Sequence, residues 1–206
     1  MTRLIIIRHG QTAWNEGEGE RLRGRADLEL DEIGVRQAGA AATRMALWGV
    51  AAVYSSPLRR AVNTAEILAE PLGLKAQRLE GLIDIDYGRW QGLSLKEAEA
   101  NDPELYRLWL QSPHLATFPG GEGLEQVRER VTSAVETLVP RHPGQTVVLV
   151  SHKVVCKVLL CSLLGLDNSH FWQIQQGLCA ISLVEIENDV PVMLLLNDTC
   201  HLRDVG

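Results

Sequence analysis

Two histidines and two arginines stand just after short apolar runs of the sequence. Arg8 and His9 follow residues 4–7, His152 follows residues 146–151, and Arg60 lies a few residues beyond residues 51–54. A neutral imidazole can accept a phosphoryl group, and its ordinary pKa of about 6.5 makes that form available near pH 7. The planar fork of an arginine can hold two phosphate oxygens. These residue types make phosphoryl transfer the candidate chemistry.

The positions of these residues along the chain also favour an anion site. His152 opens an expected helix, and backbone N–H groups at a helix N-terminus attract anions. Arg59 and Arg60 begin another expected helix, where positive charge opposes the helix dipole unless an anion lies in front of it. Gly10 beside His9 is expected to let the backbone approach a ligand closely. We therefore expect a phosphate to bind where these segments meet.

Short β-branched runs and longer helical patterns alternate along the chain. Apolar patterning and turn residues predict strands over residues 4–7, 51–54, 146–150, 179–186 and 190–196, with a turn at 187–189. The same reasoning predicts helices over residues 32–47, 59–72, 103–110, 124–139 and 153–164. Ser94 and Glu97 form a capping-box pattern, so another helix should begin there.

This alternation predicts an α/β fold, a three-layer α/β/α sandwich with a mostly parallel central sheet. In such sheets the ligand site lies outside the carboxyl ends of the strands, which is where the two histidines are expected. Residues 79–118 break the alternation and are rich in Gly and Trp. We expect them to form a small lid inserted into a single domain that spans residues 1–206.

Net charge and composition limit the classes of binding partner and the cellular locations that fit this protein. The net charge of −6 argues against nucleic acid and membrane surfaces, because both need a basic face. The apolar run at the N-terminus is too short for a signal peptide, and the apolar stretch 146–166 is interrupted by His152, Lys153 and Lys157. The four cysteines show no CxxC spacing and are expected to be reduced, buried thiols. These features predict a cytoplasmic protein, and no metal-ligand spacing or cofactor motif is evident.

The segment around His9 resembles the signature of a known protein family. The segment Arg8-His9-Gly10-Gln11-Thr12-Ala13-Trp14-Asn15 resembles the R-H-G-x-[ST]-x-W-N signature of the histidine phosphatase superfamily, which includes the cofactor-dependent phosphoglycerate mutases. The resemblance continues through residues 55–65, 84–92, 120–130, 150–155 and 197–202. Several separated motifs in the right order are more specific than one pattern match. The resemblance implies the phosphoglycerate mutase-like fold.

The resemblance also implies roles for the site residues. His9 would be the nucleophile, Arg8, Arg60 and His152 would clamp the phosphoryl group, and Asn15 would add a hydrogen bond. Such a site agrees with the physics of phosphoryl transfer, which depends mostly on positioning and on stabilising the charge of the phosphoryl oxygens. No metal ion is expected in a site of this kind.

The proton for the leaving alkoxide needs a separate donor. In the phosphatase branch of the family this general acid is usually a Glu before a G-x-W-x-G motif, and here Asp84 stands at that position before Gly88-Arg89-Trp90-Gln91-Gly92. The pKa of Asp84 would have to rise, which nearby Asp86 and the bound phosphate favour as like charges. Asp86 is the alternative acid.

Chain length favours hydrolysis over the mutase reaction. The familiar mutases carry a longer insertion after their first motif and in the lid, and this chain reads Gly24-Arg25-Ala26-Asp27-Leu28 where those enzymes differ. A phosphoglycerate mutase remains an alternative. A non-catalytic phosphoester-binding protein is a further one, although no residue of the expected pocket has been lost.

The substrate is expected to be a small phosphorylated metabolite with a second anionic group. Arg23 stands where many relatives carry Gln and could pair with a carboxylate, and Gly24 and Lys153 are further substrate-binding candidates. The chain is similar to the metal-independent phosphoserine phosphatases, but Tyr87 stands where they use a lid histidine. Phosphoserine is therefore one candidate, and α-ribazole phosphatases, phosphoglycerate-type phosphatases and broad-specificity phosphatases are alternatives.

Other aromatic and histidine residues have two readings. Trp90 and Trp109, with Tyr87, could wall the substrate pocket or could simply pack the lid onto the core. His201 could reach the site or a subunit interface. By analogy with the family, a homodimer is possible.

Overall fold

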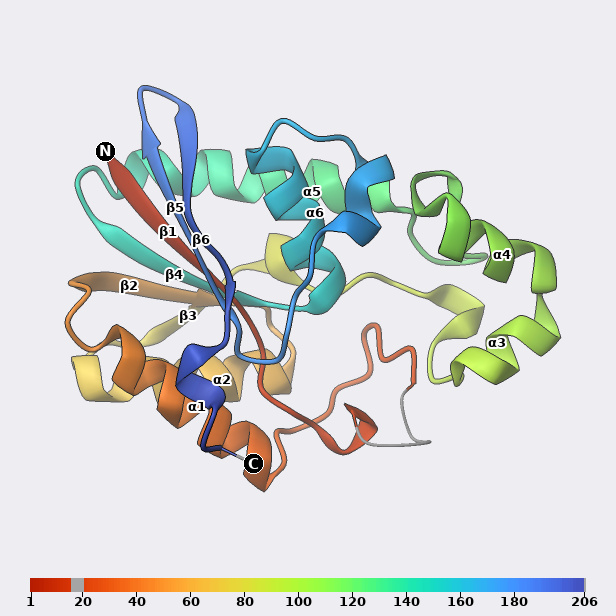
Figure 1. Cartoon of the computed structure of the whole chain (residues 1–206), viewed down its shortest axis with the longest axis horizontal. Helices are drawn as coiled ribbons and strands as arrows, with labels where there is room; N and C mark the ends of the chain where they lie inside the picture. The colour runs from red at the N-terminus through yellow and green to blue at the C-terminus, as the bar shows by residue number, and fades with distance from the viewer. Residues whose placement is uncertain (16–20, 206) are drawn as a thin grey trace.

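A mixed sheet forms the centre of the computed structural model, which describes residues 1–15 and 21–205 (Figure 1). Within these residues the sheet has six strands in the order β3-β2-β4-β1-β5-β6. The strands β3, β2, β4 and β1 are parallel to one another. β5 runs antiparallel to both of its neighbours, β1 and β6. Their bounds are β1 Thr2–Arg8, β2 Val50–Ser55, β3 Ala76–Arg78, β4 Thr146–Ser151, β5 Ile181–Glu187 and β6 Val190–Asp198. The predicted α/β fold with a mostly parallel sheet is confirmed.

Helices cover both faces of this sheet. α1 (Glu32–Met45) and α2 (Arg59–Ala69) lie below it in Figure 1, and α5 (Leu124–Leu138) and α6 (Lys153–Leu163) lie above it. Alternate residues of β1 belong to two separate hydrophobic clusters. Ile5 and Ile7 pack with α1 and α2, whereas Leu4 and Ile6 pack with α5 and α6. The period of two that a strand imposes on its side chains therefore produces the three layers.

Two elements differ from the sequence prediction. β3 was not predicted, because Ala76-Gln77-Arg78 is short and mostly exposed and lacks apolar alternation; it is a strand only through its pairing with β2. The predicted helix 59–72 ends as an α-helix at Ala69, and residues 70–72 form a 3₁₀ turn. Pro71 has no N–H to continue the α-helical ladder, and this explains the early end.

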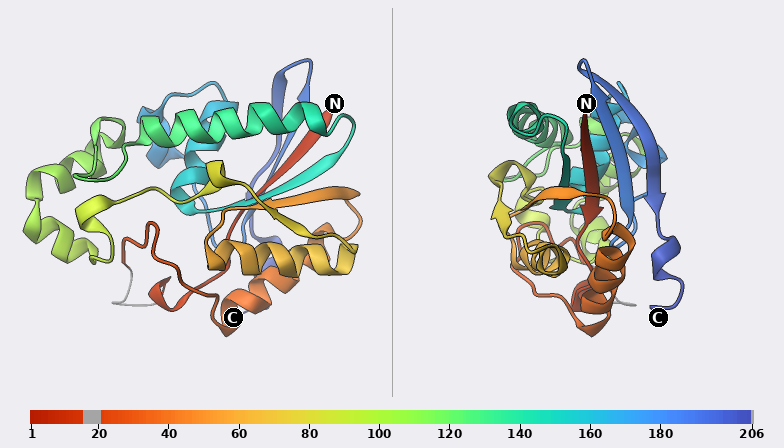
Figure 2. Two further views of the ribbon diagram at one scale, coloured as in Figure 1. Left: turned by 180° about the vertical axis from the view of Figure 1, so that it is seen from behind. Right: turned by 90° about the vertical axis from the view of Figure 1, so that its left-hand side faces the viewer.

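Residues 79–118, called the insert segment below, extend past the carboxyl ends of the parallel strands. They carry α3 (Leu95–Asn101) and α4 (Pro103–Gln111), which lie at the right of Figure 1 and at the left of the first view in Figure 2. The predicted capping box is present: Glu97 N–H donates to Ser94 Oγ at 3.2 Å, and Ser94 N–H donates to Glu97 Oε2 at 2.7 Å. The function of the insert segment as a lid stays a prediction.

An aromatic cluster lies within the insert segment. The ring of Phe118 lies 4.9 Å from that of Tyr87 and 5.2 Å from those of Trp90 and Trp109, measured between centroids. All four side chains are almost fully buried and belong to the same hydrophobic cluster as α5 and α6, and the ring of Trp109 lies 5.3 Å from that of Phe171, outside the segment. The cluster therefore packs the segment onto the core, as one of the two sequence readings proposed.

The cysteines and the apolar helices bear on two further expectations. Cys156, Cys161 and Cys179 are buried, but Cys200 is exposed, so the prediction of four buried thiols is wrong at that position. Cys200 lies in the short 3₁₀ turn that follows β6, where no layer of the fold covers it. Among the residues that the structure describes, no helix is long and apolar enough to cross a membrane.

Candidate active site

Parallel pairing of β1 with β4 brings the two strand-end histidines together. Arg8 and Ser151 are register partners, and His9 N–H donates to Ser151 O at 2.9 Å. The rings of His9 and His152 then lie 5.2 Å apart between centroids at an angle of 56°. The carboxyl ends of two neighbouring strands thus build the floor of one site, as expected for such sheets.

The hydrogen bonds of His9 define its tautomer. Its Nδ1 lies 2.7 Å from Gly10 O, and because a carbonyl oxygen only accepts, Nδ1 carries the proton. Nε2 then holds the lone pair and accepts from Arg60 Nε at 3.2 Å. Burial, followed by the positive charges of Arg60 and Arg8, holds the pKa of His9 well below its ordinary value. His9 is therefore neutral near pH 7, with its free lone pair on Nε2.

Gly10 has a packing reason to lack a side chain, and its expected close approach to a ligand stays a prediction. A Cβ on Gly10 would lie 2.5 Å from Gly34 O, at the start of α1. A Cβ on Gly34 would in turn collide with the main-chain O of Gln11 and lie 2.7 Å from its N. The two glycines let the loop after β1 pass against the N-terminus of α1, which holds His9 in place.

We expect Gly34→Ala to lower the free energy of unfolding by about 1–3 kcal/mol, because backbone atoms on both sides must move. Gly39→Ala, in the same helix with open space around the position, is the matched control and should stabilise by roughly 0.4–1 kcal/mol. Urea unfolding of both variants measures the difference. Equal effects of the two substitutions would show that the loop gives way easily.

Arg60 is fully buried beneath the site and is held by several partners. Besides His9, its guanidinium donates to Ala26 O at 2.6 Å, to Gly24 O at 2.7 Å and to Asp84 Oδ2 at 2.9 Å. Burial lowers its pKa, and the neighbouring carboxylate of Asp84 opposes that shift. In this structure Asp84 supplies the negative charge that was expected from a bound anion.

The preceding Arg59 also meets carboxylates of the protein. Arg59 Nε donates to Asp27 Oδ2 and Nη1 donates to Glu29 Oε1, both at 2.9 Å. Two arginines at the start of α2 are thus compensated by carboxylates from elsewhere in the chain. Their unfavourable position relative to the helix dipole does not by itself require a phosphate.

The two candidate acids have different surroundings. Asp84 lies 7% exposed, with Oδ1 accepting from Ile85 N–H at 2.9 Å and Oδ2 3.6 Å from His152 Nδ1. Burial raises the pKa of Asp84 above its ordinary value, although Arg60 pulls it the other way. Asp86 is more exposed and pairs with Arg25 at 3.3 Å. Asp84 lines the pocket described below, whereas Asp86 is not among its lining residues.

His152 and Arg8 lie behind the pocket surface. His152 Nε2 is 2.7 Å from Ser56 Oγ, which comes from the end of β2. Burial, then Arg60, holds the pKa of His152 well below its ordinary value. Arg8 is buried and its Nη1 donates to Gln176 O at 3.0 Å. Neither residue is among those that line the pocket, and the ring of His152 lies 5.2 Å from that of His9.

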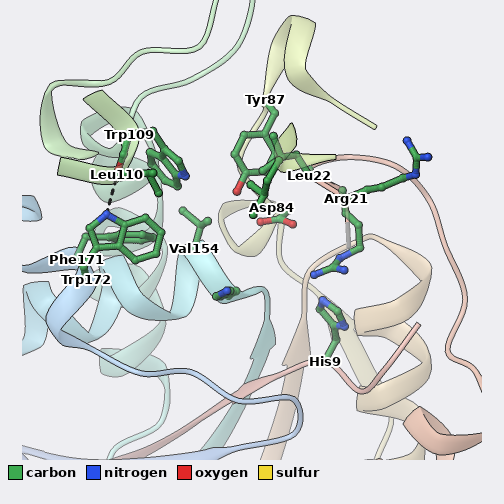
Figure 3. Close-up of a pocket in the computed structure, with 14 residues that line it drawn as sticks. His9, Arg21, Leu22, Asp84, Tyr87, Trp109, Leu110, Val154, Phe171 and Trp172 are labelled. Carbon is green, nitrogen blue, oxygen red and sulfur yellow. Dashed lines mark hydrogen bonds between the residues drawn. The ribbon is translucent and has the colours of Figure 1, made fainter. Parts of the chain in front are cut away.

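A pocket opens above His9 and Asp84 (Figure 3). Four of the predicted substrate-binding residues line it, namely Arg23, Gly24, Tyr87 and Lys153. In Figure 3 Tyr87 points down into the pocket above Asp84. Asn15 is not one of the lining residues: its Oδ1 accepts from Thr12 N–H at 3.0 Å and from Thr12 Oγ1 at 2.9 Å and so caps a local turn.

The opposite side of the pocket is an aromatic wall, defined here as Trp109, Phe171 and Trp172. Trp172 Nε1 donates to Trp109 O at 3.0 Å, and Leu110 and Val154 continue the apolar surface (Figure 3). Trp109 was an expected wall residue, whereas Trp90 is not among the lining residues. Sequence reasoning missed Phe171 and Trp172, because nothing in their local pattern shows that the turn after α6 meets the insert segment.

Arg21 and His201 differ in their position relative to the pocket. Arg21 lines the pocket and was not predicted, although a cation two residues before Arg23 was a usable signal. His201 lies away from the lining residues, and its Nε2 is 3.1 Å from Cys179 O. Among the described residues no group of three or more His, Cys, Asp or Glu side chains could hold a metal ion.

Comparison with known proteins gives consistent matches. A family model described as histidine phosphatase superfamily (branch 1) matches residues 4–199. Phosphoserine phosphatase 1 of Hydrogenobacter thermophilus is 38% identical over 204 residues, which are 99% of this chain and 96% of that protein.

Solved structures agree with the sequence matches. Bacillus stearothermophilus YhfR has a TM-score of 0.93 at 30% identity and covers 98% of this chain and 100% of its own. A mutant phosphoserine phosphatase from Entamoeba histolytica, solved with phosphoserine, has a TM-score of 0.87 at 28% identity, with coverage of 98% and 100%. The fold is therefore shared over nearly the whole chain.

Proposed function

Since the chain belongs to the histidine phosphatase superfamily and is a phosphatase, we propose that it hydrolyses a small phosphomonoester through a phosphohistidine on His9, without a metal ion. The observation that carries this proposal is the state of His9. It is buried and neutral, its Nδ1 proton is held by Gly10 O, and its Nε2 belongs to a residue that lines the pocket. A nucleophile held in one tautomer needs no further activation by a base.

In the first step His9 Nε2 attacks the phosphorus atom of the substrate. The N–P bond forms as the P–O bond to the alcohol breaks, and the protonated carboxyl of Asp84 gives its proton to the leaving oxygen. The contact between Arg60 Nε and His9 Nε2 is exchanged for contacts with the phosphoryl oxygens, whose negative charge the guanidinium stabilises. Arg8 and His152 support the same group from behind.

In the second step water attacks the phosphohistidine. The carboxylate of Asp84, now deprotonated, takes a proton from the water as the new P–O bond forms and the N–P bond breaks. Inorganic phosphate leaves, and both His9 and Asp84 return to their starting states. Asp84 thus acts as acid and then as base, a task for which a pKa raised by burial is suited.

The substrate that we propose carries a second anionic group, with phosphoserine as the first candidate. Arg21, Arg23 and Lys153 line the pocket and supply positive charge beyond the single phosphoryl site. A relative with 38% identity is a phosphoserine phosphatase by name, and a similar structure was solved with phosphoserine. Tyr87 also lines the pocket, and by the resemblance it stands where those enzymes use a lid histidine.

We expect Arg23→Gln to weaken binding of phosphoserine and 3-phosphoglycerate about tenfold to hundredfold, because a charged hydrogen bond contributes roughly 1.5–3 kcal/mol. The KM of p-nitrophenyl phosphate, which has no carboxylate, should change little. Steady-state kinetics on the three substrates measures this. An equal rise of KM for all three would instead assign Arg23 to the phosphoryl group.

A second candidate, a broad-specificity phosphatase, is favoured by the aromatic wall. Trp172 is 38% exposed and Leu110 46% exposed at this surface, which suits apolar leaving groups better than serine. The α-ribazole phosphatase and phosphoglycerate mutase alternatives rest on similar proteins of those names and on no feature of the pocket.

Phosphate release in EDTA from a panel of esters tests these proposals together. The panel contains phosphoserine, 3-phosphoglycerate, α-ribazole phosphate and p-nitrophenyl phosphate. Metal-independent release led by phosphoserine supports the first candidate, and release led by p-nitrophenyl phosphate supports the second. Formation of 2-phosphoglycerate with little free phosphate would show a mutase instead. A cytoplasmic location and a homodimer stay predictions.

A further inference from the structure

Arg130 on α5 donates hydrogen bonds to the main chain that leads to Asp84. Arg130 Nη1 donates to Gly81 O at 3.0 Å and to Ile83 O at 2.6 Å, and Nη2 donates to Asp84 O at 3.2 Å. The side chain of Arg130 is 19% exposed, so these bonds are largely shielded from water. A single guanidinium therefore holds three carbonyl groups within four consecutive residues.

A carboxylate completes this arrangement from the other side. Glu122 accepts from Arg130 Nε at 3.0 Å and from Nη2 at 3.2 Å, so the guanidinium is oriented by two bonds. Glu122 Oε2 also accepts from Asp86 N–H at 2.9 Å. Arg130 and Glu122 thus hold the main chain both before and after Asp84.

The segment between these contacts has little secondary structure of its own. Only residues 80–82 form a 3₁₀ turn, and no strand or α-helix fixes the main chain at Asp84. A general acid must lie within hydrogen-bond reach of the leaving oxygen, and a misplacement of about 1 Å can cost on the order of 10²-fold in rate. The carboxyl of Asp84 faces the pocket, while its main chain is held on the side of α5.

We propose that Arg130 is a positioning residue for the general acid, acting through the main chain of Asp84 and oriented by Glu122. The proposal rests on the proposed function, in which Asp84 gives its proton to the leaving alkoxide. Arg130 is not among the residues that line the pocket. Its effect on the first step should therefore appear only with substrates whose leaving group needs this proton.

The dependence on leaving group distinguishes positioning from a general structural role. A serine alkoxide cannot leave without a proton, whereas p-nitrophenolate is a stable anion that leaves unaided. We expect Arg130→Met to lower kcat/KM on phosphoserine by about tenfold to hundredfold and kcat/KM on p-nitrophenyl phosphate by less than about threefold. The quantity kcat/KM reports the first step and not the second, in which Asp84 acts as base with every substrate. Arg130→Lys, which keeps the charge and one donor, should recover part of the loss.

Arg128 on the same helix provides the matched control. Its Nη1 donates to Leu166 O at 2.8 Å, so Arg128→Met removes an arginine–carbonyl bond of the same kind away from Asp84. We expect the ratio of the two kcat/KM values to stay at that of the wild type in this variant. Glu122→Gln is the milder second variant, which keeps the chain folded if Arg130→Met does not, and should shift the ratio in the same direction.

An unchanged ratio in both Arg130→Met and Glu122→Gln would overturn the inference, as would an equal loss on both substrates. His9→Ala, run in the same assay, reports separately on the proposed function. If His9→Ala kept the wild-type rate, the phosphohistidine route itself would fail. If His9→Ala is inactive and the ratio does not move, only the role of Arg130 fails.

Discussion

His9→Ala is expected to lower phosphate release by about 10⁴-fold or more and to abolish any covalent phosphoenzyme. The substitution removes the only atom that the proposed first step uses as nucleophile, while Arg60, His152 and Asp84 remain to bind phosphate. The tertiary contacts of the imidazole are few, chiefly with Gly10 O and Arg60 Nε, so the fold should persist. Substrate binding should therefore survive the loss of turnover.

Two measurements check this expectation. The wild type is quenched with alkali during turnover, because phosphohistidine is stable in alkali, and its intact mass is measured by mass spectrometry. The mass should show one added phosphoryl group that acid removes. His9→Ala should show none, although it still binds phosphoserine in a calorimetric titration. His114→Ala, at an exposed position, is the control and should behave as the wild type. A phosphoryl group on His9→Ala would refute the assignment of the nucleophile.

Asp84→Asn should have the second largest effect, a fall of about 10²–10⁴-fold in kcat/KM on phosphoserine. An amide has no proton to give to the alkoxide. The kcat/KM of p-nitrophenyl phosphate should fall much less, since its leaving group needs no proton in the first step. Asp86→Asn is the matched control, because Asp86 carries the same side chain two residues away and pairs with Arg25. If Asp86→Asn showed the larger loss, Asp86 would be the acid.

The pH dependence of kcat/KM gives an independent test of the same assignment. Burial raises the pKa of Asp84, and its protonated form is the active one in the first step, so kcat/KM should be retained below that raised pKa and fall as pH increases through it. Asp84→Asn should lose the alkaline limb. Persistence of the limb in this variant would contradict the assignment.

The acid limb should report on His9. Its pKa is held well below the ordinary value, chiefly by burial, so the free enzyme keeps a neutral nucleophile until pH falls through that lowered pKa. Protonation there removes the lone pair of Nε2 and stops the first step. The two groups thus have pKa values displaced in directions that suit an acid and a nucleophile working together.

Local sequence was sufficient for most of the framework. Strand and helix periodicity is a property of neighbouring residues, so the strands that carry His9 and His152 and the helix that begins at Arg59 could be predicted. Parallel strands place their carboxyl ends on one edge, so the meeting of His9 with His152 followed from topology. The match of Asp84 to the family's acid position came from the resemblance, not from periodicity.

What only the tertiary structure decided are the contacts between residues far apart in the chain. The partner of Arg60 is the carboxylate of Asp84, the neighbour of Gly10 is Gly34, and the turn with Trp172 lies beside α4. No local pattern encodes such contacts, because each depends on how whole elements pack. The sequence by itself determined which side chains reach the strand ends; packing determined that Asp84, and not Asp86, is buried beside His9, since burial is a property of the assembled fold.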